Sequence, residues 1–143
     1  MRIVLDTSAL IAALRSSAGA AANVLELVLQ GDITLCMDFK LACEYRDVAM
    51  RPLQREASAL SIAETERLIF RLEQFSEAID VIERHRPLSI DPADDMVLDV
   101  AINGRVDVIV THNVKHLHEP GARFGISVLT PGAFLKRLTE GNR

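Results

Sequence analysis

Short apolar runs alternate along this chain with segments of helical periodicity, and this alternation constrains the fold more than any other feature. The apolar runs predict strands at residues 2–5, 33–36, 78–82, 106–110 and 126–129. Periodicity, capping residues and breaks at glycine or proline predict helices at residues 7–14, 20–29, 39–50, 61–75, 92–103 and from 131 onward. Because strands that alternate with helices form parallel sheets, the sequence predicts an α/β fold with a central parallel five-stranded sheet.

The composition fits a single domain that spans residues 1–143. Hydrophobic residues make up 49% of the chain and charged residues 25%, which is enough apolar material for a core. No apolar stretch approaches the roughly 18 to 20 residues that span a bilayer, and no signal peptide is evident, so we expect a cytoplasmic protein without a membrane partner. Cys36 and Cys43 lie in apolar surroundings, which predicts two buried, reduced thiols. The net charge of −4 favours nucleic-acid binding only if basic residues gather on one face.

Polar residues follow two of the predicted strands at the point where each strand ends. Asp6 follows the first run, and Thr111, His112 and Asn113 follow the run at 106–110. The carboxyl ends of parallel strands share one edge of the sheet, where folds of this class place their sites. We therefore expect these side chains to lie close together.

Acids also surround the first turn of the helix predicted at 92–103. Asp91 precedes a proline and is expected to cap the helix. Asp94 shares a helix face with the apolar Val97, so its carboxylate should lie near the buried side, which makes it the better candidate for a metal ligand. Asp95 points about 100° away and is a solvated acid, a supporting group or, in another register, the ligand itself.

Glu44 lies beside the apolar stripe of the helix predicted at 39–50. Taken alone, it would be expected to form an ordinary ion pair with Lys40 or Arg51. Its position after the second predicted strand makes it a further candidate for the same edge of the sheet.

The order of these segments resembles the PIN domain nucleases. Residues 3–8, Glu44, the pair Asp94 and Asp95, and residues 110–113 follow the family's order over nearly the whole chain. The ending at 124–131 is similar to that of bacterial PIN-family toxins of toxin–antitoxin systems, related to VapC. The resemblance implies a three-layer α/β/α fold in which acids from four chain segments hold Mg²⁺ or Mn²⁺ and cut RNA. The positions that match these acids are Asp6, Glu44 and either Asp94 or Asp95.

The fourth acidic position departs from the family pattern. The family usually has Thr-x-Asp, whereas this chain has Thr111, His112 and Asn113, so one negative charge is absent. Hard divalent cations prefer carboxylates, which predicts weaker metal binding. We interpret Asn113 as a tolerated variation, because its side chain keeps an oxygen. The alternative is a catalytically weak or inactive PIN-like module that binds RNA or protein.

The expected chemistry is hydrolysis of a phosphodiester with the help of a cation, which screens the anionic phosphate and lowers the pKa of bound water. The resemblance assigns direct ligation to Asp6, and ligation or orientation of metal-bound waters to Asp94 or Asp95. Glu44 would ligate a second ion or act as a base, and Asn113 would bond a metal-bound water. Whether one or two ions take part stays open.

Hydroxyl and basic side chains flank these acids. Thr7 and Ser8 are expected to cap the helix after the first strand rather than to bond the Asp6 carboxylate, and Thr111 is expected to orient a ligand carboxylate. His112, His116 and His118, with Lys115, predict a basic loop that contacts phosphate in preference to zinc. The candidates for substrate contact are Thr7, Ser8, Thr111, Arg46 and Lys115, with Arg51 and Arg123 as further contacts to the RNA backbone.

Two other classes of protein also place an aspartate after the first strand. Haloacid-dehalogenase-like phosphotransferases need Asp-x-Asp, where this chain has Ser8, and receiver domains need adjacent acids there.

The PIN resemblance further implies an antitoxin whose segment covers the acidic groove, and a homo-oligomer, expected to be a dimer. The helix at 61–75 is the candidate for a dimer surface, although its apolar residues also suit an ordinary core: Leu68, Ile69, Leu72 and Phe75.

Overall fold

The computed structural model describes residues 1–86 and 91–141. In that part of the chain the strands are β1 (Arg2–Leu5), β2 (Thr34–Met37), β3 (Glu77–Ala78), β4 (Val108–Val110) and β5 (Ser127–Leu129). They form one five-stranded sheet in the order β3-β2-β1-β4-β5, and every pair is parallel. The predicted parallel sheet is confirmed.

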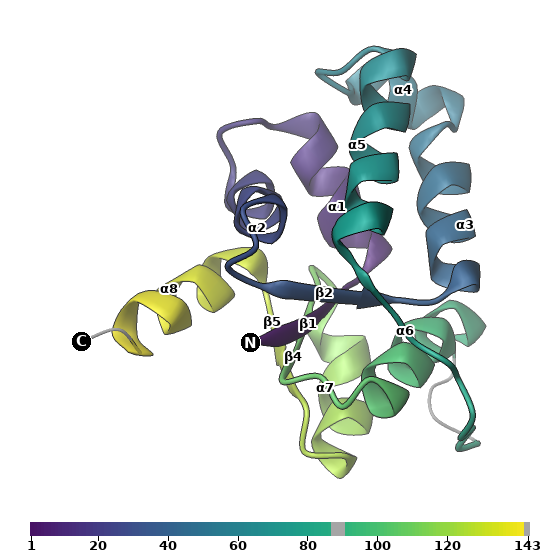
Figure 1. The fold of residues 1–143 in the computed structure, drawn as a ribbon, viewed down its shortest axis with the longest axis vertical. Coiled ribbons are helices and arrows are strands. Elements are labelled where there is room, and N and C mark those ends of the chain that lie inside the picture. The colour runs from purple at the N-terminus through teal and green to yellow at the C-terminus, as the bar shows by residue number, and fades with distance from the viewer. Residues whose placement is uncertain (87–90, 142–143) are drawn as a thin grey trace.

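Helices cover both faces of this sheet. They are α1 (Thr7–Arg15), α2 (Ala20–Leu29), α3 (Phe39–Ala49), α4 (Pro52–Ala57), α5 (Ile62–Phe75), α6 (Pro92–Asn103), α7 (Val114–Arg123) and α8 (Pro131–Gly141). One layer contains α1, α2, α3 and α5, and the other contains α6 and α7 (Figure 1). The expected three-layer α/β/α fold is confirmed.

The central strands are buried on both faces, as their apolar runs require. Ile3, Val4 and Leu5 of β1 are buried, and so are all three residues of β4. On the outer strand, α7 approaches β5 so closely that a Cβ added at Gly121 would lie 2.8 Å from Val128 Cγ2. Glycine at this position therefore permits the contact between α7 and the sheet.

The strand predicted at 78–82 is much shorter in the structure. Only Ala78 of that range is in β3, and one further backbone bond joins the Ile79 N–H to the Met37 carbonyl over 2.9 Å. The chain then leaves the sheet because Asn103 of α6 binds it: its Oδ1 accepts from the N–H groups of Ile82 and Glu83 at 3.0 and 2.9 Å.

Two helices lie outside the sequence prediction. The first is α4, in which Pro52 occupies the first turn, where a missing N–H has no cost. The segment predicted as a basic loop forms α7, which buries Leu117, Pro120 and Gly121 on one face. Pro120 and Gly121 interrupt the helical periodicity of this segment in the sequence.

The two cysteines differ in their surroundings. Both are free thiols, and Cys36 is buried in β2 as expected. Cys43 is exposed, so the prediction of a buried thiol is wrong there. The reason is that α3 buries the face carrying Leu41 and Tyr45, while Cys43 lies off that face.

Among the described residues, no single helix has the length and apolar character to cross a membrane. Helices α1 and α2 are bent by 103° relative to each other, and only the two together reach that length and apolar composition.

Candidate functional site

The carboxyl ends of β1 and β4 lie side by side and form the middle of the candidate site. In the sheet β1 lies between β2 and β4, so the chain leaves β1 toward one edge and later returns to its other side. Open parallel sheets place ligands at such a switch point. The Asp6 N–H donates to the Val110 carbonyl over 2.9 Å, which brings Asp6 next to Thr111.

Two hydroxyl groups hold the Asp6 carboxylate. Thr111 Oγ1 donates to Asp6 Oδ2 over 2.6 Å, and Ser8 Oγ donates to the same oxygen over 2.8 Å. Thr111 is fully buried and Asp6 is 8% exposed. The predicted capping role of Ser8 is wrong, because its hydroxyl binds this carboxylate and Asp6 itself occupies the N-cap of α1. Neither hydroxyl uses Oδ1, the second oxygen of the carboxylate.

Glu44 is tied to the same strand end through Thr7. The Thr7 hydroxyl, itself buried, donates to Glu44 Oε2 over 2.6 Å instead of capping α1. The alternative of an ordinary ion pair is not realised, because Arg51 binds Asp47 over 2.9 Å and Glu44 has no ion pair within the part of the chain that the structure describes. The structure thus brings Asp6 and Glu44 to one junction.

Tyr45 supports this junction from inside the core. Its hydroxyl donates to the carbonyl of Leu5, the residue before Asp6. Pairing between β1 and β2 ends before Leu5, so this buried carbonyl needs a partner from outside the sheet. Burial, followed by the negative charges of Asp6, Glu44 and Asp38, raises the pKa of Tyr45 well above its usual value of 10.0. Tyr45 therefore remains a neutral donor.

The two neighbouring acids of α6 have different surroundings. Asp91 caps the helix, as predicted. Asp94 is buried, and its Oδ2 lies 4.0 Å from His116 Nδ1 on α7. Asp95 Oδ2 lies 3.7 Å from the Nε of Arg86. Asp94 is therefore the buried member of this pair of acids, whereas Asp95 lies beside the guanidinium of Arg86.

Asn113 occupies the N-cap of α7, but its side chain makes no capping bond and is exposed. Its N–H donates to Thr111 Oγ1 over 2.8 Å. The N–H of His112 likewise donates to Ser8 Oγ over 3.1 Å. The backbone of this turn therefore holds the same two hydroxyls that bind Asp6.

The predicted basic loop is wrong, because Lys115, His116 and His118 belong to α7. All three are exposed, whereas Leu117, Pro120 and Gly121 form the buried face of the helix. Among the described residues, no three His, Cys, Asp or Glu side chains are grouped closely enough to hold a metal ion by themselves.

Arg46, a predicted contact to the RNA, is paired within the protein. It forms an ion pair with Glu73 of α5 over 2.5 Å and so joins two helices of one layer. Arg51, in its pair with Asp47, lies on the same helix layer.

Three residues of this edge lie outside the sequence prediction. Asp38 follows β2 as Asp6 follows β1, and that pattern identifies it; it caps α3 by accepting from the Leu41 N–H over 2.9 Å. Arg86 makes two hydrogen bonds with Asp99, at 3.0 and 2.9 Å. No sequence pattern indicates Arg86 or Asp99, because Arg86 comes from a connection and Asp99 from the middle of α6.

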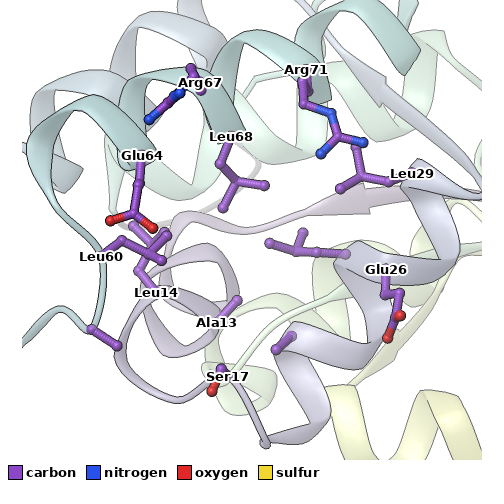
Figure 2. A pocket seen from close by; sticks show the side chains of 13 residues that line it. Ala13, Leu14, Ser17, Glu26, Leu29, Leu60, Glu64, Arg67, Leu68 and Arg71 are labelled. Carbon is purple, nitrogen blue, oxygen red and sulfur yellow. The ribbon is translucent and has the colours of Figure 1, made fainter.

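A separate groove lies away from this edge, between α1, α2 and α5. It has a volume of about 520 Å³, and Leu14, Leu60 and Leu68 line its apolar part, while Glu26 and Arg71 stand beside it (Figure 2). None of the predicted site residues lines this groove. It is therefore a different feature from the acidic site.

Comparison with known proteins agrees with this geometry. The PIN domain family matches residues 2–115. Among solved structures, the chain is similar to VapBC2 from Rickettsia felis bound to a DNA fragment from their promoter, with 17% identity and a TM-score of 0.56 over 90% of this chain and 97% of that chain. No curated protein matches the chain. Because the family match spans most of the sequence, including both strand ends and the acids of α3 and α6, the chain belongs to the PIN domain family.

Proposed function

We propose that this protein is a divalent-metal-dependent endoribonuclease and the toxin of a toxin–antitoxin pair. The observation that carries the proposal is the Asp6 carboxylate, buried at the switch point with two hydroxyls on one oxygen. Such bonds fix the orientation of a carboxylate that ligates a metal. Glu44, held by Thr7 at the same junction, and the buried Asp94 supply further acids.

The donor atoms suit Mg²⁺ or Mn²⁺, which take oxygen ligands. Mg²⁺ keeps several waters and uses only one or two direct carboxylates, so a cluster of three close acids is not required. The combined action of Asp6, Glu44 and Asp38 on the pKa of Tyr45 supports a concentration of negative charge at this point. When bound, the cation would screen the phosphate and lower the pKa of its water.

The residues have distinct roles in this proposal. Asp6 and Asp94 would hold the cation through carboxylate oxygens, and Glu44 would hold a second ion or accept a proton from a water molecule. Ser8 and Thr111 hold Asp6, and Thr7 holds Glu44, so these three are positioning residues. Asn113 would bond a water of the hydrated cation, and Lys115 would contact the RNA backbone.

A second candidate function is a PIN-like module that binds RNA or protein without cutting. The exposed amide of Asn113, at the position where the family usually has an acid, favours this alternative.

The similarity to VapBC2 supports the proposed antitoxin partner. A homodimer and a cytoplasmic location stay predictions; Ile69 and Leu72 of the expected dimer helix belong to the core, whereas Phe75 is 52% exposed.

The direct test is cleavage of labelled mixed-sequence RNA with Mg²⁺, with Mn²⁺ and with EDTA. We expect cleavage with either ion and none with EDTA. Asn113→Asp is expected to raise the metal affinity about 10-fold, because it restores a carboxylate. If wild type is inert with both ions while Asn113→Asp cuts, the native protein is a binder. If neither cuts, the ribonuclease proposal is wrong.

Asp94→Asn and Asp95→Asn form a matched pair on neighbouring positions. We expect Asp94→Asn to reduce cleavage at least about 100-fold, or about 2.7 kcal/mol in activation free energy. Asp95→Asn should retain activity within about 3-fold, since Asp95 faces Arg86. Initial rates at saturating Mg²⁺ measure both. The reverse order would make Asp95 the ligand.

A further inference from the structure

A second cavity lies on the same edge of the sheet as the acidic site. It has a volume of about 260 Å³ and lies where α3 and α6 begin. Asp38, which follows β2, and Asp95, which follows Asp94, connect it to the proposed catalytic acids. Its charged lining residues are Asp38, Lys40, Arg84, Arg86, Asp95 and Asp99.

Each acid of this cavity is already compensated within the protein. Asp38 accepts from a backbone N–H at the start of α3, where the helix dipole stabilises negative charge. Asp99 is bound by Arg86 at 3.0 and 2.9 Å, and the same guanidinium lies 3.7 Å from Asp95. The charge of Arg86 is therefore used inside the protein.

Two cations remain for a ligand. Lys40 and Arg84 are exposed and make no ion pair with any residue of ranges 1–86 and 91–141. Lysine and arginine in this state are the usual contacts of a phosphate backbone. Val81 and Met96 add an apolar part to the cavity, against which a sugar can pack.

We propose that this cavity binds a phosphate of the RNA strand, adjacent to the scissile phosphate, with Lys40 and Arg84 as its contacts. The inference rests on the proposed ribonuclease function and specifies how its substrate is held. The volume lies slightly below the range of about 300 to 1,000 Å³ found for drug-sized ligands, which suits a phosphate with its sugar.

The test measures RNA binding apart from cleavage. Fluorescence anisotropy with a short labelled single-stranded RNA is recorded over a series of salt concentrations, in the Asp6→Asn background. Lys40→Ala and Arg84→Ala are compared with Lys136→Ala and Arg137→Ala, which remove the same charges from exposed positions of α8, on the other side of the molecule from α3 and α6 (Figure 1).

Each cavity variant is expected to weaken binding about 3- to 10-fold and to lower the slope of log K against log salt by about 0.7, the value for one single-strand phosphate contact. The loss should be equal for RNAs of different sequence, since phosphate contacts do not read bases. The two control variants should bind like the Asp6→Asn parent.

The outcomes separate this inference from the proposed function. If RNA binds and the cavity variants keep the affinity and salt slope of the parent, the cavity is not a phosphate subsite, although the ribonuclease proposal stands. Equal losses in the cavity and control variants would likewise overturn it, because they indicate general attraction. If neither wild type nor the Asp6→Asn parent binds RNA, both proposals fail.

Discussion

Asp6→Asn is expected to reduce metal-dependent RNA cleavage at least about 1,000-fold, or about 4 kcal/mol in activation free energy. The substitution keeps the shape of the side chain and an oxygen that accepts from Ser8 and Thr111, but it removes the charge that would bind the cation. Single-turnover cleavage with Mg²⁺ measures the loss, and thermal unfolding checks that the fold is retained.

The control for this prediction is Asp32→Asn. Asp32 is exposed and precedes β2, so it lies at the amino edge of the sheet, away from Asp6. The Asp32→Asn substitution removes an identical charge and should leave the rate of cleavage unchanged within about 2-fold. Cleavage by Asp6→Asn at the wild-type rate would show that the switch point is not the reaction centre.

Tyr45→Ala is expected to lower the free energy of unfolding by about 3 to 5 kcal/mol, as for other large aromatic residues removed from a core. Tyr45 is fully buried, and its hydroxyl binds the Leu5 carbonyl. Tyr45→Phe keeps the volume but leaves that carbonyl without its donor, which should cost about 1 to 3 kcal/mol. Urea unfolding measures both variants. Equal stability of Tyr45→Phe and wild type would show that the hydrogen bond contributes nothing.

The pH dependence of stability isolates the same hydroxyl. Because the pKa of Tyr45 is raised in the folded state, the unfolded chain loses this proton first as the pH rises above 10.0. The contribution is therefore complete below pH 10 and decreases above it, by about 1.4 kcal/mol per pH unit. Tyr45→Phe should lack this decrease. Tyr45 is the only tyrosine and the chain has no tryptophan, so ultraviolet absorbance follows its ionisation directly.

Local patterns predicted most of the elements but few of the contacts between them. Ser61 and Glu64 form a capping box at the start of α5, which a local pattern can predict because both partners lie in one turn. The same local reasoning predicts that the hydroxyls of Thr7 and Ser8 cap α1. They bind Glu44 and Asp6 instead. The reason is that α3 places Glu44 beside Thr7, and the end of β1 places Asp6 beside Ser8.

The sequence by itself determined the parallel sheet, its two covered faces and the family, because apolar periodicity and the residues after each strand are local properties. Tertiary structure alone decided which polar groups meet. Thr111 and Asp6 are 105 positions apart, and the pairing of β4 with β1 brings them together. It also decided that Asp95 faces Arg86, a residue that comes from outside α6, whereas the burial of Asp94 agrees with the helix face that the sequence predicts. Periodicity places a residue on a face, whereas the opposing partner is set by the packing of distant segments.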